Sequence, residues 1–202
     1  MTLDEFRPAA DELLKPFVSL SVRLGLTPNG VSLLAFLLAA AAAGTYYLAA
    51  NAATWYLLGA VLVLANGWLD LLDGALARRL EVDSEGGDLL DHVLDRYADI
   101  LIIAGLAAGL GRYGLGLAAV TGVLMTSYLG TQSQAVGLDR VYGGLLGRAD
   151  RLALVGLVTA VAPAIGGQVV GLTLVGWLLV VFAIVGHLTA LQRFYGALGA
   201  LS

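Results

Sequence analysis

The sequence contains no cysteine and few charged residues. Only 13% of its 202 residues are Asp, Glu, Lys or Arg, and Lys15 is the single lysine. Without cysteine the chain can form neither a disulfide framework nor a catalytic thiolate. Soluble domains carry about 25% charged residues. The low charge, together with 59% hydrophobic residues and a mean hydropathy of +0.86, therefore excludes an ordinary water-soluble enzyme.

The few charges are unevenly distributed. The net charge of -4 is too small and of the wrong sign for general nucleic-acid binding, so we expect no nucleic-acid partner. Nine of the fifteen carboxylates lie between Asp70 and Asp99, and only Asp139 and Asp150 come later. This cluster of acids is the feature that a functional interpretation has to explain.

Apolar runs predict an all-α integral membrane protein with six transmembrane helices. A bilayer core needs about 20 apolar residues per helix. The runs lie at 31–50, 55–68, 113–128, 151–165 and 169–189, and a further segment starts polar near Asp88 and becomes apolar over 100–110. A soluble, wholly buried helical bundle is the alternative, but too few charged residues follow residue 99 to cover its surface. We expect one membrane-embedded domain over 1–202, with a six-helix core over 28–195.

The segment 1–27 predicts an amphipathic helix that lies in the membrane interface ahead of the first span. Its early acidic residues, among them Asp4 and Asp11, are not compatible with a signal peptide. A loose terminal tail is the alternative interpretation.

The basic residues predict the orientation in the membrane. If the spans alternate, nine basic residues fall on one side: Arg7, Lys15, Arg23, Arg78, Arg79, Arg140, Arg148, Arg151 and Arg193. Arg112 alone falls on the other side, and loops rich in Lys and Arg face the cytoplasm. We therefore expect a protein of the cytoplasmic membrane with both termini and the active site on the cytoplasmic side.

Two pairs of aspartates stand out within the acidic cluster. Asp70 and Asp73 are three residues apart and Asp91 and Asp95 are four apart, so each pair shares one helix face. A helical hairpin would bring the pairs together near the cytoplasmic surface. Four carboxylates in a half-apolar setting cannot all stay ionised without cations. Oxygen ligands without cysteine favour Mg²⁺, Mn²⁺ or Ca²⁺, and two such ions can clamp a diphosphate.

Other interpretations of the acids are open. Glu81, Asp83 and Glu85 fit a solvated loop, and Asp88 and Asp99 share a helix face with the second pair without an assigned role. A divalent-cation transporter or channel is the alternative of another class. It would require acids through the membrane depth, whereas these acids are confined to the cytoplasmic half.

The acidic stretch carries a family resemblance. The pattern Asp70-x2-Asp73-Gly74-x2-Ala77-Arg78-x8-Gly87-x3-Asp91-x3-Asp95 resembles the signature of the CDP-alcohol phosphatidyltransferase family. The resemblance extends to Thr27-Pro28-Asn29-Gly-Val31-Ser32. It implies a homodimeric membrane enzyme that moves a phosphatidyl or archaetidyl group from a CDP-linked lipid to the hydroxyl of a polar alcohol, releasing CMP.

The resemblance also implies roles for single residues. Asp70, Asp73, Asp91 and Asp95 match the ligands of two Mg²⁺ or Mn²⁺ ions, and Asp95 also matches the general base that takes the acceptor's proton. The positions that match the donor-binding residues are Asn29, Ser32, Gly74, Ala77, Arg78, Ser84 and Gly87. Among these, Arg78 would offer a planar guanidinium to phosphate oxygens.

The acceptor is less constrained by the sequence. Arg148, Arg151 and Arg193 lie at cytoplasmic helix ends and can bind an anionic acceptor such as glycerol phosphate or inositol phosphate; the other interpretation is that they only set topology. The region resembles inositol-phosphate-transferring members, which carry basic residues where this chain has Gly130 and Gln132. Glycerol phosphate, and uncharged alcohols such as serine or inositol, therefore stay open, as does the choice between diacylglycerol and archaeol in the donor.

Overall fold

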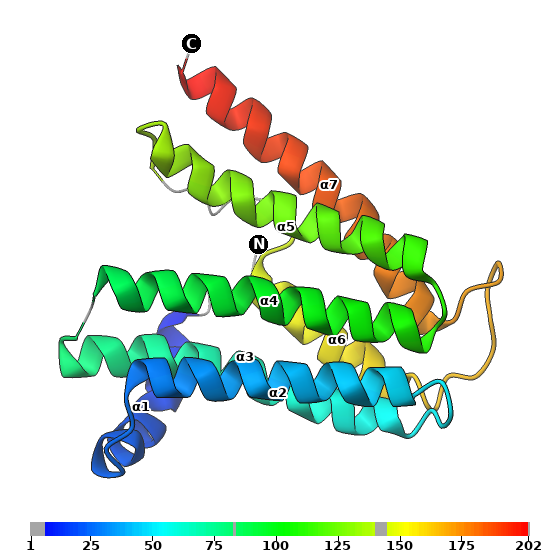
Figure 1. Cartoon of the computed structure of the whole chain (residues 1–202), viewed down its shortest axis with the longest axis horizontal. Coiled ribbons are helices and arrows are strands. Elements are labelled where there is room, and N and C mark those ends of the chain that lie inside the picture. Colours follow the sequence, from blue (N-terminus) through cyan, green and yellow to red (C-terminus); the bar gives the residue numbers. More distant parts are fainter. Residues whose placement is uncertain (1–6, 83, 140–144, 202) are drawn as a thin grey trace.

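The chain folds into a bundle of α-helices, as the sequence predicts. The computed structural model describes residues 7–82, 84–139 and 145–201, so Asp83 and Arg140 lie outside the described residues. Within these ranges there are seven helices: α1 (Arg7–Arg23), α2 (Pro28–Leu48), α3 (Trp55–Leu80), α4 (Glu85–Gly109), α5 (Tyr113–Ala135), α6 (Arg148–Val161) and α7 (Leu174–Leu201). Figure 1 shows α2, α3 and α4 running along the long axis, with α5 and α7 forming a neighbouring pair.

Four of the described helices are long and apolar enough to cross a membrane, namely α2, α3, α5 and α7. The two other predicted spans correspond to α4 and α6. The first half of α4 carries the second aspartate pair, which lowers its hydropathy, and α6 has only 14 residues, about 21 Å of helix against a hydrocarbon core of about 30 Å. The predicted all-α membrane architecture is confirmed at this level.

Two N-terminal caps position the helix starts that matter for the site. The Thr27 hydroxyl accepts a 3.2 Å hydrogen bond from the Gly30 amide, with Pro28 in the first turn of α2. The Ser84 hydroxyl accepts a 3.1 Å bond from the Gly87 amide at the start of α4. Such caps satisfy amides that lack a partner inside the helix. Helices α2 and α4 both begin at the same end of the bundle, where α3 ends (Figure 1).

Small residues bring α2 and α4 into close contact near their other ends. A Cβ atom added to Gly105 would lie only 2.6 Å from the Ala43 Cα atom, and one added to Gly109 would meet the Tyr46 carbonyl group. Glycine is required at both positions because the two backbones approach so closely. Tyr46 is completely buried, and its hydroxyl forms a 3.1 Å hydrogen bond with Thr159 of α6.

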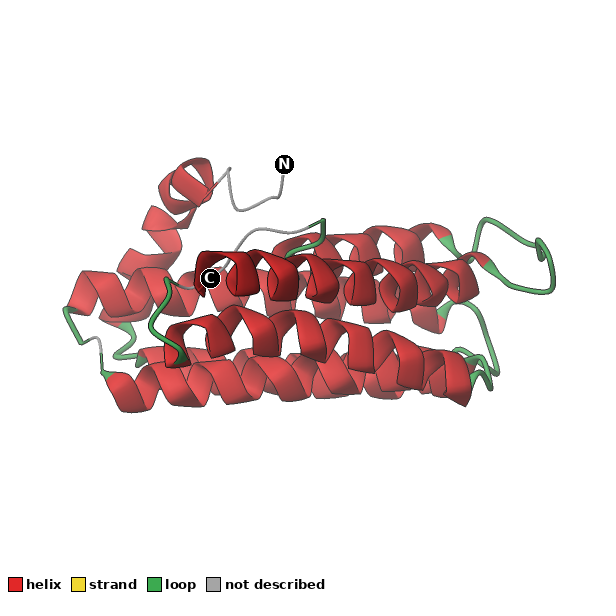
Figure 2. Ribbon diagram, turned by 90° about the horizontal axis from the view of Figure 1, so that it is seen from above, coloured by secondary structure: helices red, strands yellow, loops and turns green. Residues whose placement is uncertain are grey.

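Helix α1 runs across the long axis of the bundle (Figures 1 and 2). Its buried residues Leu14 and Val18 pack against Leu72 and Leu76 of α3. Phe17 makes an edge-on contact with Trp68, the ring centroids being 5.3 Å apart. The opposite side of α1 leaves further apolar side chains exposed, among them Leu13 and Leu20.

Candidate active site

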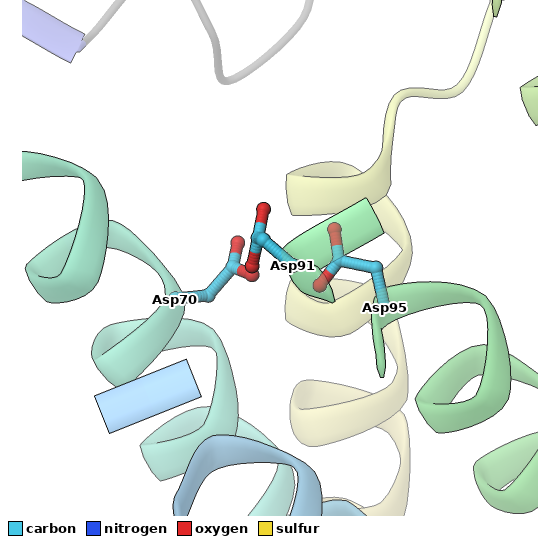
Figure 3. A group of neighbouring side chains, drawn as sticks. All are labelled: Asp70, Asp91 and Asp95. Carbon is cyan, nitrogen blue, oxygen red and sulfur yellow. The ribbon is translucent and has the colours of Figure 1, made fainter. Parts of the chain in front are cut away.

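Three of the four predicted metal ligands converge in space. Asp70 of α3 and Asp91 and Asp95 of α4 each offer one carboxylate oxygen, and these atoms all lie within 4.8 Å of one another. Figure 3 shows the three side chains directed toward one another from the two helices. The hairpin of α3 and α4 thus brings Asp70 of the first pair next to both members of the second pair.

The fourth predicted ligand, Asp73, is held by α2. Its Oδ2 atom accepts a 2.7 Å hydrogen bond from the Ser32 hydroxyl, across 41 positions of sequence, and its side chain is buried. Asp73 does not belong to the convergent group of three, but it lines the same two hollows as Asp91. It therefore lies between the acidic group and the start of α2.

A hollow at the starts of α2 and α4 collects most of the residues implied to bind the donor. Its lining includes Asn29, Ser32, Gly74, Ala77, Ser84 and Gly87, together with the aspartates Asp73, Asp88 and Asp91. A Cβ atom on Gly87 would lie 3.0 Å from the Ser84 Oγ atom and 3.3 Å from the Asn29 Oδ1 atom. A side chain there would narrow the hollow, so glycine keeps it open.

Arg78 lies at the edge of this hollow. A Cβ atom on Gly74 would be 3.5 Å from an Arg78 guanidinium nitrogen. Arg78 also lines a second, more open hollow between α1 and α3, together with Lys15 and Arg79. The structure thus places the Arg78 guanidinium between this hollow and α1.

Two arginines of α6 contact the aspartates of α3 and α4. Arg148 Nη1 donates to Asp70 Oδ1, and Arg148 Nη2 lies 2.8 Å from Asp95 Oδ1. Arg151 Nη2 donates a 2.7 Å hydrogen bond to Asp99 Oδ2, and both side chains are buried. Since charged pairs this deep form only when well matched, the two arginines are built into the site.

The start of α6 is fixed by its own acidic residue. The Asp150 Oδ2 atom accepts a 2.8 Å hydrogen bond from the Gly147 amide. This contact defines where the helix begins and therefore where Arg148, its first residue, lies relative to α3 and α4.

The third predicted acceptor arginine has different surroundings. Arg193 of α7 is buried, and its Nη1 atom donates a 2.7 Å hydrogen bond to the Thr126 carbonyl oxygen of α5. The Thr126 hydroxyl in turn donates a 2.8 Å bond to the Gly186 carbonyl of α7. Arg193 thus joins α5 to α7, whereas the ion pairs described at the acidic centre involve Arg96, Arg148 and Arg151.

Sequence reasoning assigned no role to three residues of this centre. Asp99 is a buried partner of the α6 arginines, and Arg96 lies 3.4 Å from Asp95. Asn66, one turn before Asp70, donates through Nδ2 to the Ala35 carbonyl (2.9 Å), while its buried Oδ1 atom has no hydrogen-bond partner. In the sequence, only the four-residue spacings from Asp95 to Asp99 and from Asn66 to Asp70 indicate that these residues share a helix face with the predicted metal ligands.

The donor set fits a hard divalent cation. All three convergent groups are carboxylates, neither sulfur nor imidazole is among them, and Mg²⁺ and Mn²⁺ prefer oxygen ligands. Asn66 lines a hollow together with Asp70, Asp91 and Asp95, and its buried Oδ1 atom is a further oxygen acceptor.

Comparison with known proteins identifies the family. The sequence pattern that defines the CDP-alcohol phosphatidyltransferases matches residues 25–188, so the chain belongs to the CDP-alcohol phosphatidyltransferase family. It is a metal-dependent phosphotransferase of phospholipid synthesis, with Mg²⁺ or Mn²⁺ as its cofactor, and an integral membrane protein. The enzyme interpretation is thereby confirmed over a cation transporter.

Relatives agree over most of the chain. The archaetidylinositol phosphate synthase of Methanothermobacter thermautotrophicus is 33% identical over 95% of this chain and 91% of its own length. The phosphatidylinositol phosphate synthase of Mycobacterium tuberculosis with bound CDP-DAG has the same fold, with a TM-score of 0.77, 24% identity and coverage of 92% of this chain and 94% of that one. The structure of that synthase with manganese and citrate has a TM-score of 0.77 at 25% identity, covering 91% and 88%.

Proposed function

We propose that this enzyme transfers the phosphatidyl or archaetidyl group of a CDP-linked lipid to the hydroxyl of a polyol phosphate and releases CMP. The observation that carries the acceptor class is the placement of Arg148 and Arg151 directly beside the acidic centre. An anionic acceptor needs cations within reach of the reacting groups, and arginine is suited to a phosphate because its planar guanidinium donates to two oxygens at once.

The aspartates carry the chemistry in this proposal. Asp70, Asp73, Asp91 and Asp95 hold two Mg²⁺ or Mn²⁺ ions, which neutralise charge on the diphosphate when bound. Asp95 accepts the proton of the acceptor hydroxyl as its oxygen attacks the lipid-side phosphorus. The bond from that phosphorus to the bridging oxygen breaks, and CMP leaves with the electron pair. Alignment and fixed charge contribute most of the rate enhancement in such a transfer.

The hollow at the starts of α2 and α4 is proposed to hold the CDP group. The residues assigned to it are Asn29, Ser32, Gly74, Ala77, Arg78, Ser84 and Gly87, of which all but Arg78 line the hollow. The glycines and Ala77 leave room for the nucleotide, and Arg78 at the edge pairs with phosphate oxygens.

Arg193 is included in the acceptor site as a third cation. Because Arg193 also donates to the Thr126 carbonyl, a mutation can distinguish acceptor binding from a role in joining α5 to α7. If Arg193 binds acceptor, Arg193→Lys should raise the acceptor KM severalfold with little change in the thermal midpoint. If it only joins α5 to α7, the thermal midpoint should fall and the acceptor KM should stay as it was.

The proposed membrane arrangement has α2 to α7 as six spans in one domain over 1–202, with α1 in the interface. The exposed apolar side of α1 supports an interfacial position. Because the acidic centre lies at the end of the bundle that holds Arg78 and Arg79, the positive-inside rule assigns that end, and both termini, to the cytoplasm. Two copies associate as a homodimer, as the family resemblance implies.

An acceptor screen tests the proposed function. Purified enzyme in lipid nanodiscs with Mn²⁺ is supplied with CDP-diacylglycerol or CDP-archaeol and with glycerol phosphate, inositol phosphate, glycerol, inositol or serine. The expected result is CMP release with a polyol phosphate and little release with the uncharged alcohols. The names of the relatives favour inositol phosphate, whereas Gly130 and Gln132 leave glycerol phosphate as its competitor. Turnover with serine or inositol alone would overturn the proposed acceptor class.

A further inference from the structure

Asp99 is the most deeply buried acid of the centre and does not belong to the family signature. It lies one turn after Asp95 on α4 and is 4% exposed. Its Oδ2 atom accepts the 2.7 Å bond from Arg151, and its Oδ1 atom lies 3.8 Å from Arg148 Nε. A buried carboxylate with two arginine neighbours remains charged, so it holds both guanidiniums at one place.

Arg148 is shared between this residue and the acids of the metal centre. Its other two partners, Asp70 and Asp95, are two of the three residues whose oxygens converge. The guanidinium of Arg148 and a divalent cation therefore compete for the same two carboxylate groups. Two positive groups beside the same carboxylates repel each other strongly in a partly buried site.

The consequence depends on which partners Arg148 can keep. When Asp70 and Asp95 ligate a divalent cation, Arg148 loses two of its three acidic neighbours and retains Asp99. Arg151 is unaffected, because its described partner is Asp99 alone. The guanidinium groups of Arg148 and Arg151 then have more N–H donors than the Asp99 carboxylate has oxygens to accept them. The buried Nε atoms of both arginines already lack hydrogen-bond partners.

We propose that Asp99 is a positioning residue that assembles Arg148 and Arg151 into a receptor for the phosphate of the acceptor, and that the receptor forms only after a divalent cation displaces Arg148 from Asp70 and Asp95. This inference rests on the proposed function, since it concerns the acceptor site named there. It predicts an order of binding, with cation before acceptor, and it gives this chain's own arginine a regulatory contact with its metal centre.

Metal binding tests the displacement step independently of catalysis. Mn²⁺ affinity is measured by electron paramagnetic resonance on the protein in nanodiscs, without lipid donor. Arg148→Gln removes the competitor and should bind Mn²⁺ about tenfold more tightly. Arg79→Gln is the control. It removes an exposed arginine at the end of α3 and should change the Mn²⁺ affinity less than about twofold. Equal or weaker binding by Arg148→Gln would overturn the displacement.

Kinetics test the positioning role. Asp99→Asn should raise the KM for inositol phosphate or glycerol phosphate about tenfold, with much smaller changes in the KM for CDP-diacylglycerol and in Mn²⁺ affinity. Asp99→Glu, which keeps the charge, should recover part of the loss. An Asp99→Asn enzyme with reduced kcat and an unchanged acceptor KM would contradict the proposal.

Two further outcomes keep the tests decisive. If Asp99→Asn does not fold, Arg151→Lys takes its place, because it keeps the charge but loses the planar fork, and it should raise the same acceptor KM. If the wild-type enzyme uses no polyol phosphate, the proposed function fails at the acceptor, and the Mn²⁺ measurement on Arg148→Gln still decides whether the arginine competes with the cation.

Discussion

The Ser32 hydroxyl donates a 2.7 Å hydrogen bond to the Asp73 carboxylate, and both side chains are buried. This bond connects the first turn and a half of α2 to the beginning of the acidic stretch. It matters because Ser32 lines the donor hollow and Asp73 is a proposed metal ligand. The two proposed functions of the site, holding the nucleotide and holding the cation, thus depend on one contact.

Ser32→Ala should impair the use of CDP-lipid more than the use of acceptor. A hydrogen bond to a charged group contributes about 1.5–3 kcal/mol, so kcat/KM for the lipid donor should fall at least about tenfold. The matched control is Ser19→Ala on α1, where the hydroxyl donates within its own helix to the Lys15 carbonyl. Equal activity of the two variants would contradict the role of the Ser32–Asp73 contact.

Asp95→Asn should abolish transfer. The substitution removes the proposed general base and the negative charge of one of the three convergent carboxylates, and general-base catalysis alone contributes about 10²–10⁴ in rate. CMP release in reconstituted lipid is the measurement. Glu85→Gln, in the exposed first turn of the same helix, is the control and should stay close to wild type. Substantial activity of Asp95→Asn would exclude Asp95 as the base.

Removal of divalent cations should stop the reaction reversibly. EDTA-treated enzyme is expected to release no CMP, and Mg²⁺ or Mn²⁺ should restore turnover, whereas Zn²⁺ should restore little, because the centre offers only carboxylate oxygens. Asp70→Asn should need a higher Mn²⁺ concentration for half-maximal activity, since it removes one ligand charge. A chelated enzyme that keeps its full rate would contradict the proposed metal centre.

Gly105→Ala should destabilise the protein through the contact between α2 and α4, which lies away from the acidic centre. The added Cβ atom would lie 2.6 Å from the Ala43 Cα atom, and overpacking of this kind costs about 1–3 kcal/mol. The thermal midpoint in detergent should therefore fall. Gly44→Ala on α2 is the control, because a Cβ atom there meets nothing within 4 Å and should preserve or raise the midpoint.

Local features of the fold could be predicted because they depend on neighbouring residues. The spacing within Asp70–Asp73 and Asp91–Asp95 indicates shared helix faces, and the polar turn between the pairs indicates a hairpin. The structure has both. Apolar runs indicated the helices, although the last of them begins at Leu174 and continues to Leu201, beyond the predicted end at residue 189. Gln192 and Arg193 interrupt the apolar run there, but they do not end the helix, because both residues are compatible with helical backbone.

The contacts of the arginines could not be predicted in the same way. Arg148 and Asp70 are 78 positions apart, and Arg151 and Asp99 are 52 apart. Which acid faces which arginine depends on how α6 packs against α3 and α4, and no spacing rule encodes that packing. Asp99 therefore has no role in a sequence pattern, even though it is the acid that pairs with Arg151.

The close contact between Ala43 and Gly105 has a consequence for the distant site. Helix α4 is continuous from Glu85 to Gly109, so Gly105 and Asp95 belong to one rod and lie about 15 Å apart along its axis. We expect a change in the α2–α4 separation at Gly105 to tilt this helix and thereby to alter the spacing between Asp95 and Asp70. Because Ala43 and Gly105 determine how closely α2 and α4 approach, we expect substitutions there to offer a means of tuning metal preference without replacing a single ligand.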